Sequence, residues 1–292
     1  MCDVFTEQDN EEFLKSRGID RRDFNKVGSL AALMAALPVS ACAQQPIEEK
    51  MVEVTMPDGV SDCYFVAPSK GKHPAILMWP DIKGLRPAFK VMGKRLAENG
   101  YAVLVVNPFY RDAKAPVAGD NPNFSDPETR KFLVRMARKL VQDAAMSDAR
   151  AYINFLDAQK GVDTSRKVGT CGYCMGGPLI MRTAGARPDR VGAAASFHGG
   201  GLATDKPDSP HLLIPNSPAH VLHAIAENDD ERTPDAKTIL AQAYEAAGVP
   251  AEIEVYEGTK HGWCPPDSTV YDEAQAEKAW SRMLALYERA LA

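Results

Sequence analysis

Short apolar runs alternate with longer amphipathic segments from residue 46 to the C-terminus. Residues 75–79 (Ala-Ile-Leu-Met-Trp) are apolar at every position, which is typical of a strand buried on both faces of a sheet. Residues 272–291 carry apolar side chains at helical spacing. Strands separated by helices predict a mainly parallel central sheet with helices on both faces. The predicted fold class is therefore α/β, built as a single domain over residues 46–292.

The individual elements are predicted from the period of the apolar positions and from turn residues. A hairpin is predicted where two alternating segments flank Pro57-Asp58-Gly59. Its strands cover residues 52–56 and 63–67, and further strands are predicted at residues 75–79, 102–106, 168–171, 193–197, 219–226 and 252–256. Helices are predicted at residues 87–99, 126–158, 174–184, 234–247 and 272–291. The polar, proline-containing stretch 110–127 predicts a surface loop.

The first 45 residues form a separate segment with the features of an export signal. Residues 21–26 (Arg-Arg-Asp-Phe-Asn-Lys) resemble a twin-arginine signal, and the apolar stretch 27–39 is too short to span a bilayer comfortably. Ala41-Cys42-Ala43 contains a candidate cleavage site that would leave Gln44 as the first mature residue. The same region resembles a lipobox, which would attach a lipid to Cys42. We expect an exported protein, either periplasmic or lipid-anchored at the cell envelope; the alternative is an amphipathic helix of a cytoplasmic protein.

Composition and charge narrow the classes of function. The 292 residues are 45% hydrophobic and 25% charged, as in a soluble globular protein. The net charge is −5 and the basic residues are spread along the chain, so no nucleic-acid-binding surface is predicted. Membrane association is expected only through a lipid on Cys42. Six widely spaced cysteines do not establish a disulfide framework, which favours a single reactive thiol among structural ones.

The motif most indicative of chemistry is Gly172-Tyr173-Cys174-Met175-Gly176, between a predicted strand and a predicted helix. It matches the nucleophile elbow pattern, with cysteine in place of serine. Glycines two residues before and after the nucleophile remove side chains that would clash in the strained turn. The turn also places the sulfur at a helix N-terminus, where the dipole favours the thiolate.

Two alternative interpretations of Cys174 concern packing and redox chemistry. Cys174 could be a small buried hydrophobic residue, although a glycine-rich elbow is unnecessary for that. Cys171 and Cys174 also form a C-x-x-C pair, as in thioredoxin-like sites. Redox chemistry would leave Gly176-Gly177 and the downstream polar residues unexplained.

A nucleophilic cysteine needs a base, and the base needs an orienting acid. In α/β-hydrolases the acid and then the base follow the nucleophile along the chain. The predicted strand 219–226 is followed by the acid candidates Asp229 and Asp230, and the predicted strand 252–256 is followed by His261. Both positions lie beyond the carboxyl ends of strands, where ligands bind in open α/β sheets. His261 is the only histidine after the acid candidates and is the predicted base.

An oxyanion hole needs two backbone N–H groups. Met175 directly follows the nucleophile and is predicted to supply one of them. The other should come from the loop after the strand 75–79. Pro80 has no N–H, so Ile82 is the predicted donor.

Taken together, these motifs resemble the dienelactone hydrolase family of α/β-hydrolases over roughly residues 50–291. The resemblance rests on Gly172–Gly177, Ala226–Asp229, His261–Trp263, Asp81–Leu85, and a terminal helix region with Tyr271, Ala279 and Trp280. It implies an α/β-hydrolase fold and cleavage of a small-molecule ester or enol-lactone without metal or organic cofactor. It further implies Cys174 as nucleophile, His261 as base and Asp229 as acid, although Asp230 better fits the usual distance to the following proline.

The chain departs from the family pattern at positions that bear on the substrate. Asp81 stands where the family usually has a glutamate that contacts the resting nucleophile. Pro265 stands where members acting on dienelactone carry an arginine for the substrate carboxylate, and Arg111 is a candidate replacement cation. Candidate pocket residues are Trp79, Phe109, Tyr110, Tyr173 and Trp263, with core packing as the alternative for most of them.

The expected mechanism is covalent catalysis through a thioester. Two alternatives from other classes stay open. A thiol–disulfide redox protein would depend on Cys171 as well as Cys174, and a binding protein on a hydrolase scaffold would bind ligand without turning it over.

Overall fold

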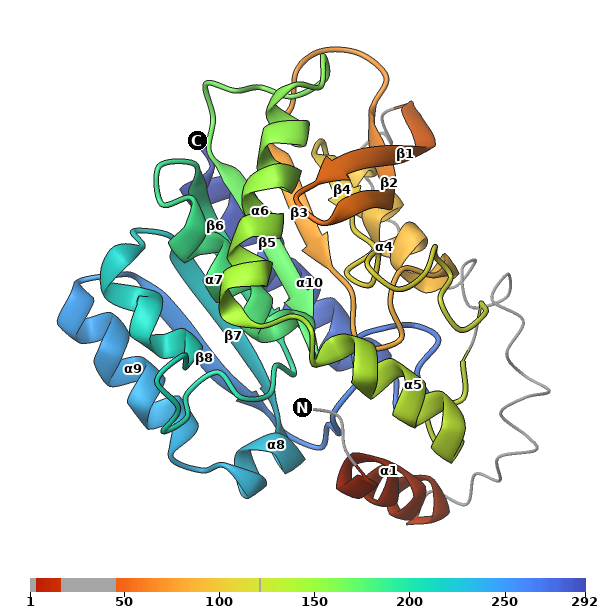
Figure 1. The fold of residues 1–292 in the computed structure, drawn as a ribbon. Helices are drawn as coiled ribbons and strands as arrows, with labels where there is room; N and C mark the ends of the chain where they lie inside the picture. The colour runs from red at the N-terminus through yellow and green to blue at the C-terminus, as the bar shows by residue number, and fades with distance from the viewer. Residues whose placement is uncertain (1–3, 17–45, 121) are drawn as a thin grey trace.

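The computed structural model describes residues 4–16, 46–120 and 122–292; the twin-arginine, cleavage-site and lipobox motifs lie outside these residues. An eight-stranded sheet has the order β1-β2-β4-β3-β5-β6-β7-β8 (Figure 1). β1 (Ile47–Met56) and β2 (Gly59–Pro68) form the predicted hairpin, with Met56 opposite Gly59. β2 also pairs antiparallel with β4 (Ala102–Val105), and every later strand pair is parallel. The predicted mainly parallel sheet is confirmed.

The sheet is buried because its strands carry apolar residues toward both faces. Every residue of β3 (Ala75–Trp79) and of β4 is buried. The remaining strands are β5 (Val168–Tyr173), β6 (Val191–Phe197), β7 (His220–Ala226) and β8 (Ala251–Tyr256). Successive residues contribute to opposite cores: Ile76 and Met78 pack in one, Leu77 and Trp79 in the other.

Helices cover both faces of the sheet (Figure 1). One face carries α4 (Pro87–Glu98) and α10 (Glu273–Ala290). The other carries α6 (Gln142–Asp157), α7 (Gly176–Ala186) and α9 (Ala236–Ala247). The other described helices are α1 (Val4–Ser16), α5 (Pro127–Ala137), α8 (Glu227–Arg232) and the 3-10 helix η1 (Pro210–Asn216). This layered arrangement is the α/β-hydrolase fold that the sequence predicts.

The prediction of one helix over residues 126–158 is wrong, because the chain forms α5 and α6 with a break between them. Asp126 caps α5 by accepting a hydrogen bond from the Thr129 N–H (2.8 Å), and Pro127 occupies the first turn. The break buries Leu140, whose carbonyl accepts a hydrogen bond from Arg182 of α7 (3.0 Å). A tertiary contact therefore interrupts a segment whose local sequence favours helix. The short helix α8 was also not predicted.

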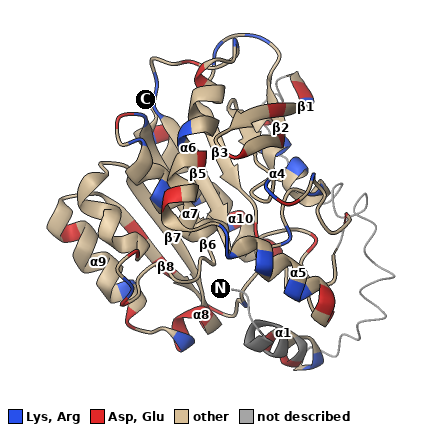
Figure 2. Ribbon diagram, viewed as in Figure 1, with Lys and Arg blue, Asp and Glu red and all other residues tan. Residues whose placement is uncertain are grey.

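Acidic and basic residues are scattered over the ribbon in the view of Figure 2. Among the helices described, none is both long and apolar enough to cross a membrane. Likewise, the described side chains include no group of three or more histidines, cysteines or carboxylates placed to hold a metal ion.

Candidate active site

Cys174 directly follows β5 and has a left-handed backbone, with φ of 53°. This conformation is strained for a residue with a Cβ and is found mainly at functional sites. A Cβ on Gly172 would overlap the carbonyl of Gly176. A Cβ on Gly176 would lie 2.5 Å from the carbonyl oxygen of Trp79. The chain can therefore make this turn only with glycine on both sides of the cysteine, as the elbow pattern predicts.

Helix α8, which directly follows β7, and the loop after β8 bring a carboxylate and an imidazole together beside this turn. His261 Nδ1 lies 2.7 Å from Asp229 Oδ2. Asp230, the other acid candidate, instead pairs with Lys237 of α9. The side chain of Asn228 accepts a hydrogen bond from the His261 backbone N–H (2.9 Å) and so fixes the histidine loop. Of the two acid candidates, the structure places Asp229 against His261.

The charges of these groups are coupled. Burial alone would lower the pKa of His261, but the Asp229 carboxylate and the Cys174 side chain, both hydrogen-bonded to its ring, raise that pKa to about 10. Burial raises the pKa of Asp229, and the adjacent His261 more than offsets this, so the pKa lies below its ordinary value. The site therefore favours an imidazolium between two acidic groups, which suits a thiolate–imidazolium pair.

The loop after β3 lies against the elbow and forms a tight turn. The Gly84 N–H donates to the Asp81 carbonyl (2.9 Å), and the Lys83 N–H donates to the Asp81 carboxylate (2.8 Å). Neither the Ile82 N–H nor the Met175 N–H has a hydrogen-bond acceptor among the residues described here. Within the described part of the chain, both predicted oxyanion donors therefore have N–H groups without a backbone acceptor.

A buried arginine that sequence analysis missed also borders the site. Arg86 is 1% exposed and its guanidinium makes paired hydrogen bonds to Asp81 (2.7 and 2.9 Å) and to Asp267 (2.6 and 2.9 Å). Asp81, a predicted substrate contact, thus has its carboxylate engaged by Arg86. Burial works against the charge of Asp267, but the guanidinium keeps the pKa of Asp267 below its ordinary value. Asp267 is 181 residues away in sequence, so no local pattern indicated this cluster.

Tyr110 and Arg111, two other residues predicted to contact the substrate, are bonded to the carboxylate of Asp148. The Tyr110 hydroxyl donates to Asp148 of α6 (2.8 Å). Arg111 makes paired bonds to the same carboxylate (2.7 and 2.8 Å) and a further bond to Asp58 in the β1–β2 turn (2.8 Å). The candidate cation is therefore neutralised by two carboxylates in this structure.

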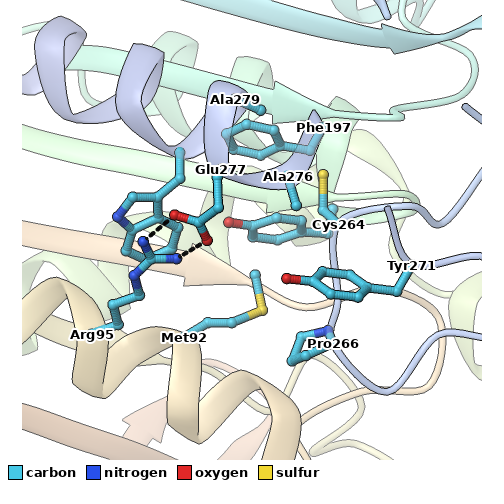
Figure 3. Close-up of a pocket in the computed structure, with 11 residues that line it drawn as sticks. Met92, Arg95, Phe197, Cys264, Pro266, Tyr271, Ala276, Glu277 and Ala279 are labelled. Carbon is cyan, nitrogen blue, oxygen red and sulfur yellow. Dashed lines mark hydrogen bonds and ion pairs between the residues drawn. The ribbon is translucent and has the colours of Figure 1, made fainter. Parts of the chain in front are cut away.

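The aromatic rings of Tyr173 and Trp263 lie in the core that faces α4 and α10. Tyr173 stacks on Phe197 and Trp263 stacks on Tyr256, each with ring centroids 4.8 Å apart. Tyr173 also lines a small pocket beneath the elbow, between α4, α10 and the loop after β8 (Figure 3). Tyr173 and Trp263 both contact other aromatic side chains on this face, which agrees with the core-packing interpretation of these two residues.

A second buried histidine lies beside the catalytic candidates. His198 directly follows β6, has φ of 40°, and its ring centroid lies 5.1 Å from that of His261. Neither of its ring nitrogens has a hydrogen-bond partner among the described residues. Burial, and then the neighbouring His261, lower the pKa of His198 to about 3, so its ring is neutral. Sequence analysis passed over His198 because it precedes the acid candidates; the available signal was its place directly after a strand.

The four described cysteines (Cys63, Cys171, Cys174 and Cys264) are buried, and none of these four forms a disulfide with another. Cys171 lies inside β5, three residues before the elbow cysteine, and packs toward α10. Burial raises the pKa of Cys171 to about 12, outweighing its hydrogen bond with Tyr287. Its thiol is therefore neutral and a poor partner for disulfide exchange.

Comparison with known proteins places this arrangement in a family. The family model of the dienelactone hydrolase family matches residues 61–291. Protein usf of Aquifex pyrophilus is 26% identical over 238 residues, covering 80% of this chain and 96% of that protein. The carboxymethylenebutenolidase of Rhodococcus opacus is 26% identical over 226 residues, covering 76% of this chain and 83% of that protein.

Solved structures agree on the fold. The crystal structure of a dienelactone hydrolase from Anabaena variabilis covers 86% of this chain and 100% of its own, with a TM-score of 0.60 and 17% identity. A dienelactone hydrolase-like promiscuous phosphotriesterase from metagenomic libraries covers 85% of this chain and 100% of its own, with a TM-score of 0.69 and 20% identity. At these identities the structures establish the fold alone. The family model spans most of the chain, and the chain therefore belongs to the dienelactone hydrolase family.

Proposed function

We propose that the protein hydrolyses an ester or enol-lactone, using Cys174 as nucleophile, His261 as base and Asp229 as the orienting acid. The observation that carries this proposal is the strained cysteine at the elbow, which is hydrogen-bonded to the His261 imidazole. The partly buried Asp229 carboxylate lies 2.7 Å from Nδ1 of that imidazole. A structural cysteine needs neither the left-handed turn nor the charge-coupled partners. Membership of a family of hydrolases supports the same reaction class.

In the proposed reaction the Cys174 thiolate attacks the carbonyl carbon and the C=O electrons move to oxygen. The Ile82 and Met175 N–H groups stabilise this oxyanion. The C–O bond to the leaving group then breaks, His261 donates a proton to the departing oxygen, and a thioester remains. His261 next takes a proton from water, whose oxygen attacks the thioester carbon. The C–S bond then breaks, His261 returns the proton to the departing sulfur, and the carboxylic acid and the Cys174 thiol are released.

The substrate class is supported by relatives rather than by the pocket. The Rhodococcus opacus relative is named for cleavage of carboxymethylenebutenolide, an enol-lactone. Because Arg111 and Arg86 are both neutralised by carboxylates, the described site presents no clear equivalent of an arginine for an anionic substrate. We therefore propose the broader class of esters and lactones rather than dienelactone itself.

Redox chemistry is the less favoured alternative. A disulfide between Cys171 and Cys174 would require the first thiol to leave β5 and the second to leave the elbow, which backbone geometry opposes. The two functions make opposite predictions for Cys171→Ala. A redox protein loses activity, whereas a hydrolase retains it.

The test is intact-protein mass spectrometry during turnover of a slow aryl ester. Wild type is expected to gain the mass of one acyl group, and Cys174→Ala is expected to gain none and to lose hydrolysis by about 10³-fold or more. Cys264→Ala is the matched control, since it removes a different buried cysteine from the described residues. Near-wild-type hydrolysis by Cys174→Ala would refute the assignment.

We also propose that the protein is exported through its twin-arginine-like segment. The N-terminal mass of protein recovered from the cell envelope distinguishes the two processing routes. A chain beginning at Gln44 indicates signal cleavage, and a lipid-modified Cys42 indicates anchoring. An unprocessed chain confined to the cytoplasm would refute export.

A further inference from the structure

Arg86 forms a buried ionic cluster whose two carboxylates come from different loops of the site. Asp81 begins the turn that contains Ile82, and Asp267 lies in the loop that follows His261. The guanidinium uses Nη1 and Nη2 on Asp81, and Nε and Nη2 on Asp267. It also donates to the Gly84 carbonyl at the other end of the turn (3.3 Å). A single side chain thus joins two segments. They are the turn with Asp81, Ile82 and Gly84 (the oxyanion turn) and the loop with His261 and Asp267 (the histidine loop).

The geometry of the cluster depends on the shape of arginine. A guanidinium is planar and presents its N–H groups as a fixed fork, so two carboxylates can be held at defined positions and angles. The Arg86 guanidinium carbon lies 4.8 Å from the centroid of the Phe89 ring, which packs against the guanidinium plane. A lysine could supply the charge but could not hold both carboxylates in paired contacts.

The cluster is poorly explained as a source of stability alone. Buried ion pairs lose much of their Coulomb attraction to desolvation, and well-packed apolar side chains often serve stability as well. Their better-attested contribution is to specify one arrangement of the chain. Here the arrangement specified is the position of the oxyanion turn relative to the histidine loop.

We propose that Arg86 is a positioning residue that aligns the Ile82 N–H and His261 on the two sides of Cys174. This inference rests on the proposed hydrolytic function. Arg86 itself is buried and touches no reacting atom; it acts through Asp81 and Asp267. The alignment matters because displacement of a catalytic group by about 1 Å can reduce a rate by about 10²-fold.

The first test is the steady-state kinetics of Arg86→Lys. We expect kcat to fall by about 10- to 100-fold while KM changes by less than about threefold, because the transition state requires the alignment and substrate binding requires it less. Arg95→Lys is the matched control. Arg95 lies in α4 and pairs through two hydrogen bonds with Glu277 of α10 (Figure 3). This ion pair includes neither Asp81 nor Asp267. Its replacement should leave kcat within about twofold.

Asp267→Asn provides the second arm and does not disturb the pair between Arg86 and Asp81. We expect the same fall in kcat in this variant. The double variant with Arg86→Lys should have a kcat no lower than that of the more impaired single variant, because both substitutions weaken the same connection between Arg86 and Asp267. If Arg86→Lys does not fold, Asp267→Asn alone decides the matter. Folded variants with wild-type kcat would overturn the proposal.

Alkylation of Cys174 by iodoacetamide separates failure of this inference from failure of the proposed function. If wild type shows no hydrolysis that depends on Cys174, the proposed function is wrong. The alkylation rate still reports the placement of His261, which maintains the thiolate. Arg86→Lys is expected to slow alkylation several-fold relative to Arg95→Lys, and equal rates in the two variants would overturn the positioning role.

Discussion

The backbone around Cys174 has little freedom because neighbouring backbone groups approach it closely. Gly172 faces the Gly176 carbonyl, and Gly176 faces the Trp79 carbonyl. The pattern was recognisable from sequence because the contact between Gly172 and Gly176 joins residues only four positions apart. A short motif can therefore predict a local strain that tertiary structure maintains.

The Gly172→Ala substitution is expected to destabilise the protein by about 3 kcal/mol or more, because the new methyl group must push the Gly176 backbone away. Gly161→Ala is the control, since its Cβ would meet only the Ala67 side chain at 3.9 Å. Urea unfolding of both variants measures the difference. Similar stabilities would show that the elbow relaxes more easily than its contacts indicate.

Asp229 is expected to maintain the charge of His261. Its negative charge favours the imidazolium, so Asp229→Asn should lower the pKa of His261 from about 10 toward or below its ordinary value. Titration of the imidazole nitrogens by NMR measures this shift. Asp230→Asn is a close control because Asp230 pairs with Lys237 rather than with His261. An equal shift in both variants would contradict the geometry of the pair.

Some features of the candidate site could not be predicted from sequence. The order of nucleophile, acid and base followed from the order of strands, but the choice between Asp229 and Asp230 depends on how α8 begins after β7. Arg86 and His198 were missed for a different reason. Each becomes part of the site only through partners far along the chain, and neither lies in a motif that carries chemistry.

At the scale of elements, the accuracy of the predicted bounds differs from one element to the next. The helix predicted over residues 87–99 ends one residue earlier, whereas the strand predicted over residues 52–56 begins five residues earlier, at Ile47. The apolar run at β3 has the predicted bounds because burial on both faces leaves one interpretation. The region of α5 and α6 lacks an internal glycine or proline, so its break had no local signal. It arises where the chain turns to bury Leu140 and to offer its carbonyl to Arg182.

Helix α1 contacts the site through one carboxylate. Asp9 accepts a hydrogen bond from the Asn228 side chain (2.9 Å) and pairs with Arg232 of α8. The same Asn228 holds the His261 backbone. Figure 1 shows α1 beside α8. In this arrangement Cys174 is 1% exposed and His261 is 3% exposed, so a substrate requires some opening.

We expect α1 to slow access to Cys174 while it remains attached. A chain lacking residues 1–16, and more mildly Asp9→Ala, should react with iodoacetamide several-fold faster than the full chain. Asp230→Ala is the control, because it breaks a pair on α8 that does not involve α1. Equal alkylation rates for the full and shortened chains would show that α1 does not limit access.

At the scale of the whole molecule, parallel strands bring distant residues to one edge. β3, β5, β7 and β8 all end at this edge, and the segments that follow them carry the turn with Ile82, the elbow, Asp229 of α8 and His261. This convergence could be predicted from the alternation of strands and helices. Side-chain networks that cross between loops could not, because no sequence period records them.

The buried histidines are expected to determine how stability depends on pH. Burial lowers the pKa of His223 to about 3, whereas an unfolded histidine titrates near 6.5. Between these values the unfolded chain binds a proton that the native state does not, so stability falls as pH decreases. The slope is about 1.4 kcal/mol per pH unit for each such group. His198 behaves in the same way.

His223→Gln should therefore make the acid side of the stability curve shallower by about 1.4 kcal/mol per pH unit between roughly pH 6 and pH 4. Tyr244→Phe is the matched control. The Tyr244 hydroxyl lies 2.9 Å from His223 Nε2, so this change removes the same hydrogen bond without removing a proton-binding group. It should lower stability at every pH and leave the slope unchanged. Urea unfolding across this pH range distinguishes the two effects, and an unaltered slope in His223→Gln would mean that His223 takes up its proton before the protein unfolds.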